Sequence, residues 1–116
     1  MTIQEMYSQI ESDYDKVLGR LMKETLIIRL VRKYLDDTNA QKLEESIAQK
    51  NYEDAFTAAH TLKGITANLG FDKLADSSTA ITEALRAGEY DNLEEMLAKV
   101  KADQAEVVAA IQAVEG

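Results

Sequence analysis

The chain has 116 residues and a formal net charge of −8, from 13 lysines and arginines against 21 aspartates and glutamates. This length is typical of one domain, and the negative charge disfavours binding to nucleic acid or to an anionic membrane surface. Cysteine and proline are absent and glycine is scarce, which excludes disulfides and thiolate metal sites and predicts an all-α protein. No apolar run is long enough to cross a membrane, and the first residues lack the basic and apolar regions of a signal peptide, so we expect a cytoplasmic protein.

Two short helices are expected in the first part of the chain, because apolar residues recur there at helical spacing. Ser12 or Asp13 can cap the second of them. A third helical pattern follows, but its apolar phase slips by about half a turn at residues 36–39. We therefore predict a break there and a new short helix, begun by Thr38 with Gln41 in a capping box. The apolar positions of the first two helices are Ile3, Met6, Tyr7 and Ile10, and then Tyr14, Val17, Leu18 and Leu21.

Three longer helices complete the expected fold. The first runs from about residue 52 to residue 69 and ends at Gly70, in the left-handed conformation typical of a helix C-terminus. Asp72 can cap the next helix, and Asp91 with Glu94 can form a capping box at the start of the last. Four amphipathic units with short connections predict an antiparallel up-down four-helix bundle, with the short N-terminal helices covering one end, in a single domain of residues 1–116. The four units are residues 25–49, 52–69, 72–87 and 91–114.

His60 is the single histidine of the chain and lies in the middle of the predicted helix 52–69. At about 100° per residue it points away from the apolar stripe of that helix, towards solvent. Lys63 and Gly64 are its neighbours on the same face. A glycine inside a helix costs about 1 kcal/mol relative to alanine, so we expect Gly64 and Ala67 to leave room for another molecule. The apolar stripe opposite His60 consists of Ala55, Ala58, Leu62, Ile65 and Leu69.

The segment His60-Thr61-Leu62-Lys63-Gly64, followed by Gly70, resembles the H-x-L-K-G-x5-G signature of histidine-containing phosphotransfer (Hpt) domains. Leu74 and residues 83–86 also fit the layout of that family. The resemblance implies that His60 accepts a phosphoryl group from a receiver-domain aspartate of a hybrid histidine kinase and passes it to the aspartate of a response regulator. It implies no cofactor in this chain, because the partner receiver domain binds the Mg²⁺.

Roles for the neighbours of His60 follow from this resemblance. Lys63 is expected to stabilise the phosphorylated histidine by a charge-assisted hydrogen bond. Gly64, Phe56 and Ala67 are expected to contact the partner. For Phe56 an equal alternative is packing against an N-terminal helix. We expect a monomer.

Other classes of function have less support in the sequence. One histidine without a second ligand at metal-binding spacing does not predict a metal site. A serine at nucleophile-elbow spacing and a glycine-rich phosphate loop are both missing, so we expect neither a hydrolase nor independent kinase activity. Two alternatives stay open: the phosphoacceptor domain of a larger sensor or chemotaxis-type histidine kinase, and a helical adaptor that is not phosphorylated.

Overall fold

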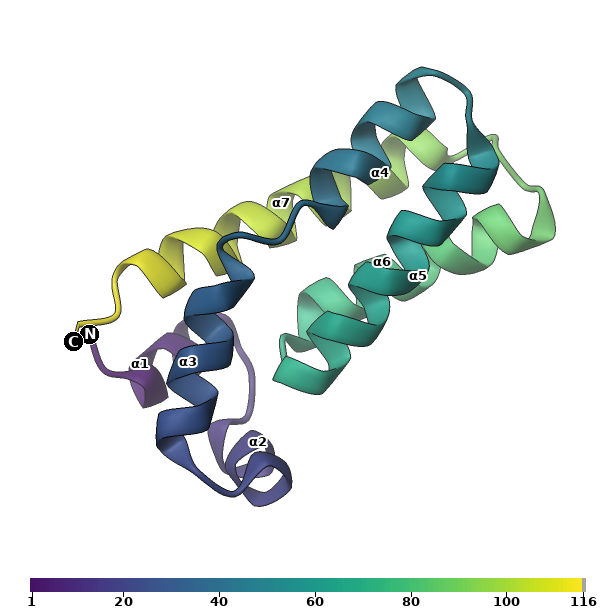
Figure 1. Cartoon of the computed structure of the whole chain (residues 1–116). Coiled ribbons are helices and arrows are strands. Elements are labelled where there is room, and N and C mark those ends of the chain that lie inside the picture. The colour runs from purple at the N-terminus through teal and green to yellow at the C-terminus, as the bar shows by residue number, and fades with distance from the viewer. Residues whose placement is uncertain (116) are drawn as a thin grey trace.

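The computed structural model describes residues 1–115, which contain seven helices and no strand (Figure 1). The prediction of an all-α protein is therefore confirmed. None of these helices is both long and apolar enough to cross a membrane. The helices are α1 (Ile3–Gln9), α2 (Tyr14–Leu21), α3 (Glu24–Tyr34), α4 (Asn39–Ala48), α5 (Tyr52–Leu69), α6 (Asp72–Ala87) and α7 (Leu93–Gln112).

Helices α4, α5, α6 and α7 pack in a closed ring. Helix α5 lies between α4 and α6, α6 also contacts α7, and α7 returns to contact α4 (Figure 1). An ion pair between Lys101 of α7 and Glu44 of α4 lies across the last of these contacts, and Lys73 Nζ of α6 is 3.0 Å from Glu106 Oε2 of α7. Each of these four helices has an apolar face. Because the helices touch in this way, their apolar faces together bury one continuous core.

The break predicted at residues 36–39 is confirmed, but the unit 25–49 does not act as one element. Helix α3 packs against α2 and α5, whereas α4 takes the place in the ring. The half-turn slip of the apolar pattern is the physical reason, because it directs the two halves of this segment to different neighbours. Asp37 bridges the break: its Oδ1 accepts a hydrogen bond from the backbone N–H of Asn39 at 2.8 Å.

The short N-terminal helices cover the C-terminal end of α5. The hydroxyl of Tyr7 donates to the carbonyl oxygen of Leu69 at 2.6 Å, and the guanidinium of Arg20 donates to the carbonyl oxygens of Ala67 and Asn68. The last carbonyl groups of a helix have no partner within the helix and carry partial negative charge. Residues of α1 and α2 therefore give donors to the carbonyl oxygens of Asn68 and Leu69, and a second donor to that of Ala67, which also accepts from the N–H of Gly70.

Phe71 joins this end of the molecule to the rest of the core. It lies in the short connection between α5 and α6 and is 1% exposed. Its ring centroid is 6.0 Å from that of Tyr7 and 5.3 Å from that of Tyr34, with a tilted and an edge-to-face geometry respectively. Rings from α1 and α3 thus enclose the α5–α6 connection, which fixes the end of α5.

Gly70 ends α5 in the left-handed conformation, with φ of 73°, as predicted. The site also lacks space for a side chain, because a Cβ at Gly70 would collide with the Cγ2 of Val17. Glycine is therefore required here for two reasons, the backbone conformation and the close approach of α2.

Of the predicted N-terminal helix caps, the one at Asp13 is confirmed and the others are wrong. Asp13 caps α2 by accepting from the N–H of Lys16 at 3.2 Å, as expected. Thr38 is the N-cap residue of α4, but its side chain makes no capping hydrogen bond, so the box with Gln41 does not form. The Asp91–Glu94 box is also wrong, because α7 begins later, after an N-cap at Asn92.

The predicted cap at Asp72 fails for a different reason. Phe71 takes the N-cap position of α6, and Asp72 is the first helical residue. The backbone N–H of Asp72 donates instead to the hydroxyl oxygen of Ser12 at 3.2 Å. A residue 60 positions earlier in the chain thus supplies a partner at this helix start, which ties α6 to the connection between α1 and α2.

Candidate functional site

Helix α5 carries His60 at its middle and is well defined at both ends. The side chain of Asn51 accepts a hydrogen bond from the N–H of Asp54 at 3.1 Å, and Glu53 and Asp54 place two negative charges in the first turn. Both features stabilise a helix N-terminus. With the end at Gly70 fixed as described, the position of His60 is set by a helix that is held at each end.

The side chain of His60 is exposed to solvent, whereas Ala59 and Leu62 on the other side of α5 are fully buried. The prediction that the imidazole points away from the core is confirmed. The neutral form of an imidazole keeps one ring nitrogen with a free electron pair. An exposed histidine of this kind is chemically competent as a nucleophile.

Phe56 lies one turn before His60, and the two rings are stacked. Their centroids are 5.7 Å apart and their planes make an angle of 12°. The guanidinium carbon of Arg86, on α6, lies 5.0 Å from the centre of the Phe56 ring. Phe56 is partly buried against the core at the same time. These contacts belong to the face that carries His60, and not to the end of α5 that the N-terminal helices cover.

Lys63 and two residues of α6 form a charged group next to His60. The Nζ of Lys63 is 3.9 Å from Oε1 of Glu83, and the Nε of Arg86 is 3.3 Å from Oε2 of the same carboxylate. We call Phe56, His60, Lys63, Glu83 and Arg86 together the histidine face. It combines an exposed imidazole with two cations and one carboxylate.

Gly64 and Ala67 continue this side of α5 and are both exposed. No neighbouring heavy atom lies within 4 Å of the place where a Cβ on Gly64 would be. The glycine is therefore not required by packing within the chain, in contrast to Gly70. Ala67 differs from Gly64 in that its carbonyl oxygen accepts a hydrogen bond from Arg20, so this position is tied to α2.

The comparison with protein families gives the class of the molecule. The sequence-family model of the Hpt domain matches residues 29–116, which is most of the chain. This chain belongs to the Hpt domain family. The resemblance found in the sequence is thus confirmed, and membership implies histidine phosphotransfer in two-component signalling. No curated protein and no solved structure matches the chain.

The Hpt match begins within α3 and includes α4 to α7. All residues of the histidine face therefore lie inside the matched region. Helices α1 and α2, which satisfy the carbonyl groups at the end of α5, precede it. The segment that precedes the matched region packs on the helix carrying His60.

Sequence reasoning assigned no role to Glu83 and Arg86 of this Hpt domain. Their spacing of three residues on α6 is a recognisable signal for an ion pair. Their approach to Lys63 and Phe56, however, depends on which face of α6 meets α5. The packing of α6 on α5 is a tertiary feature, and the contacts of Lys63 with Glu83 and of Phe56 with Arg86 show which face of α6 is involved.

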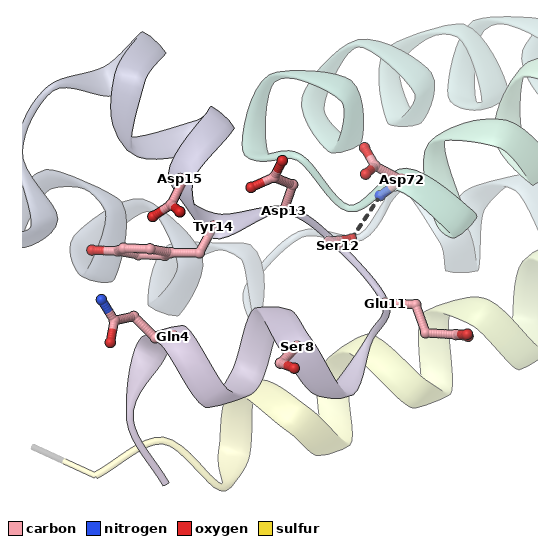
Figure 2. A pocket seen from close by; sticks show the side chains of 8 residues that line it. All are labelled: Gln4, Ser8, Glu11, Ser12, Asp13, Tyr14, Asp15 and Asp72. Atoms are coloured by element: carbon pink, nitrogen blue, oxygen red, sulfur yellow. Dashed lines mark hydrogen bonds between the residues drawn. The ribbon is translucent and has the colours of Figure 1, made fainter.

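A separate hollow lies between α1, α2 and the start of α6 (Figure 2). Figure 2 shows Ser12 at its wall, hydrogen-bonded to the N–H of Asp72. His60 lies nine residues before Leu69, the last residue of α5, which is about 13 Å along the helix axis, whereas the hollow lies beyond that end, next to Asp72. Among residues 1–115 no three histidine or acidic side chains converge as a metal site. The side chains that line the hollow are Gln4, Ser8, Glu11, Ser12, Asp13, Tyr14, Asp15 and Asp72.

The charge of this hollow makes it unsuitable for an anionic ligand. Four of the eight side chains around it are carboxylates, and like charges repel a phosphoryl group. The histidine face, by contrast, has two cations and one carboxylate. Between the two surfaces, the histidine face is therefore the less acidic one.

Proposed function

We propose that this protein is a phosphorelay intermediate. It accepts a phosphoryl group on His60 from the aspartate of a receiver domain and passes it to the aspartate of a response regulator. The exposure of His60 in the middle of α5, within a chain of the Hpt family, is the observation that carries the proposal. Lys63 on the same face supports it, because it adds positive charge where the phosphoryl group would be.

The chemical step is a displacement at phosphorus. The ring nitrogen of His60 that bears no proton attacks the phosphorus of the aspartyl phosphate. A nitrogen–phosphorus bond forms, the bond from phosphorus to the aspartate oxygen breaks, and the carboxylate leaves with the electron pair. In this proposal the Mg²⁺ that helps to neutralise the phosphoryl oxygens is bound by the receiver domain, and this chain contributes positioning and charge.

The neighbours of His60 have distinct proposed roles. Lys63 stabilises the phosphorylated histidine by a charge-assisted hydrogen bond. Gly64 and Ala67 give the receiver domain a surface without bulky side chains, consistent with their exposure and with the open space at Gly64. Phe56 contacts both His60 and Arg86 and contributes an aromatic surface beside the imidazole.

We also infer the arrangement and extent of the domain. Helices α4 to α7 are proposed to run alternately up and down, since the connections at residues 49–51, 70–71 and 88–92 are short and join helices that contact one another. Residues 1–116 are proposed to form one domain, because α1 and α2 hydrogen-bond to the end of α5. A monomer in a cytoplasmic setting remains our prediction from the sequence.

The direct test is incubation of the full chain with a receiver domain phosphorylated on its aspartate, in the presence of Mg²⁺. When the phosphoryl group of the receiver domain is labelled, the wild type should acquire this label in a form that is labile to acid and stable to alkali, as expected of phosphohistidine. His60→Gln should acquire none. Transfer from the labelled protein to a second receiver domain should follow. Equal labelling of the two proteins would contradict the proposal.

The same experiment separates the alternatives. A phosphoacceptor domain of a larger kinase would be labelled directly by an ATP-binding kinase domain and ATP, and poorly by receiver domains. An adaptor that is not phosphorylated would take no label from either source, and His60→Gln would keep its binding to the partner.

A further inference from the structure

Glu83 lies between two cations of the histidine face. Its Oε1 is 3.9 Å from the Nζ of Lys63 on α5, and its Oε2 is 3.3 Å from the Nε of Arg86 on α6. Each oxygen of the carboxylate therefore faces a different cation. We propose that Glu83 is the counter-ion of Lys63 and Arg86 before phosphorylation, and that its charge then opposes the phosphorylated state of His60. This inference rests on the proposed function.

Both cations belong to the face that carries the imidazole. Lys63 follows His60 by three residues on α5, so the two side chains lie on one face of the helix. Arg86 approaches this face from α6, where its guanidinium lies over the ring of Phe56, and that ring is stacked on His60. A phosphoryl group on the imidazole therefore has Lys63 on the same helix face and Arg86 at the Phe56 ring that is stacked on His60.

The contacts that Glu83 makes with these cations are weak enough to be exchanged. A separation of 3.9 Å exceeds the 2.7–2.9 Å typical of a charge-assisted hydrogen bond. The side chains of Glu83 and Arg86 are 53% and 52% exposed, and ion pairs in that setting contribute little stability. A phosphoryl group has a charge between about −1.5 and −2 and three acceptor oxygens, so it attracts Lys63 and Arg86 more strongly than one carboxylate does.

When the cations turn to the phosphoryl group, Glu83 keeps its negative charge beside a second anion. Like charges a few ångströms apart raise the free energy of the state in which both are present. Glu83 therefore makes the phosphorylated histidine less stable than Lys63 and Arg86 alone would make it. In a relay this favours transfer of the phosphoryl group to the next aspartate.

The test is the equilibrium between phosphohistidine and the phosphoaspartate of one receiver domain, measured with Mg²⁺ for the wild type, Glu83→Gln and a control, Glu95→Gln. Glu95 is an exposed carboxylate of α7, and its replacement changes the net charge equally. Glu83→Gln should raise the ratio of phosphohistidine to phosphoaspartate about threefold to tenfold at low salt. The increase should shrink towards zero above about 0.5 M salt, and Glu95→Gln should match the wild type.

Each outcome decides the inference. An unchanged or lower ratio in Glu83→Gln, with wild-type circular dichroism, would overturn it, and so would an equal rise in Glu95→Gln. An increase that persists at high salt would also overturn it, since a charge effect between exposed groups must be screened. If the wild type takes no label at all, the proposed function itself has failed, which is a distinct result from a labelled wild type with an unresponsive Glu83.

Discussion

The ring of Phe56 lies nearly parallel to the imidazole of His60, with 5.7 Å between the ring centroids and 12° between the planes. The exposed imidazole thus has a fixed neighbour one turn earlier on the same helix. A stacked partner restricts the rotation of a side chain that would otherwise move freely in solvent. Phe56 is in turn held by its partial burial and by the guanidinium of Arg86.

Replacement of Phe56 by leucine tests this restriction. Phe56→Leu keeps an apolar side chain against the core but removes the stack, which is worth about 0.5–1.5 kcal/mol for an aromatic pair. We expect the rate of phosphotransfer to His60 to fall by about twofold to tenfold, with little change in the unfolding midpoint. Phe56→Tyr keeps the ring and should transfer at nearly the wild-type rate. A wild-type rate for Phe56→Leu would show that the stack does not position the imidazole.

Lys63→Ala tests the proposed role of the ammonium group. The charge-assisted hydrogen bond to a phosphoryl group is lost, and for a partly exposed site we expect a cost of about 1 kcal/mol, or roughly a fivefold effect. The half-life of the phosphorylated form, or the rate of transfer, should fall by this factor. Circular dichroism should stay unchanged. Unaltered kinetics with both a donor and an acceptor receiver domain would rule out the role.

Gly64 offers a comparison of stability with function. Because no atom lies within 4 Å of the place of a Cβ, Gly64→Ala should stabilise α5 by about 0.5–1 kcal/mol in urea unfolding. Gly64→Gln should also fold at least as well as the wild type, yet its longer side chain should obstruct the receiver domain and slow phosphotransfer. If Gly64→Gln transfers at the normal rate, clearance is the wrong explanation for this glycine.

Gly70 and Gly88 form a matched pair for a stability measurement. Both end a helix with positive φ, 73° and 70°, but a Cβ on Gly70 would collide with Val17, whereas a Cβ on Gly88 meets nothing within 4 Å. Gly88→Ala should cost about 1–2 kcal/mol for the left-handed backbone alone. Gly70→Ala should cost about 1–3 kcal/mol more, because of the added overpacking. Equal losses in urea unfolding would contradict the close approach of α2 to Gly70.

Because Tyr7 and Tyr34 are buried, we expect the free energy of unfolding to fall at alkaline pH. Burial raises the pKa of both hydroxyls above the usual value near 10. At pH values below about 10 the hydroxyls are protonated in the folded and the unfolded protein, and this contribution to stability is complete. Above that pH the unfolded chain releases these protons while the folded protein retains them, so the free energy of unfolding should fall. Between pH 9 and pH 11 the free energy of unfolding of Tyr7→Phe should fall less than that of the wild type. An equal fall would show that the Tyr7 hydroxyl does not contribute to this pH dependence.

The sequence predicted the features of this fold that depend on periodicity and on local backbone conformation. The exposure of His60, the end of α5 at Gly70 and the break between α3 and α4 are all of this kind. Each follows from the spacing of apolar residues or from the conformation that glycine allows.

The wrong prediction at Asp72 concerns a group whose partner is distant in the sequence, whereas the wrong capping boxes at Thr38 and Asp91 are errors of local pattern. At the start of α6 the hydroxyl oxygen of Ser12 accepts the hydrogen bond from the backbone N–H of Asp72, and the side chain of Asp72 does not act as a cap. No local pattern around Asp72 could indicate this. Glu83 and Arg86 could be paired from their spacing on α6, but their contacts with Lys63 and Phe56 depend on how α6 packs against α5.

The segment before residue 29 lies outside the family match, yet Tyr7 and Arg20 donate to the last carbonyl groups of the helix that carries His60. A recombinant fragment trimmed to the family boundary would therefore lose the Tyr7 ring that packs on Phe71 and leave the carbonyl oxygens of Asn68 and Leu69 to water. Such a fragment should fray at this end of α5, be prone to self-association through the bared aromatic ring, and misreport the behaviour of the phosphoacceptor. Expression plasmids for biochemical work on this protein should retain its first 28 residues.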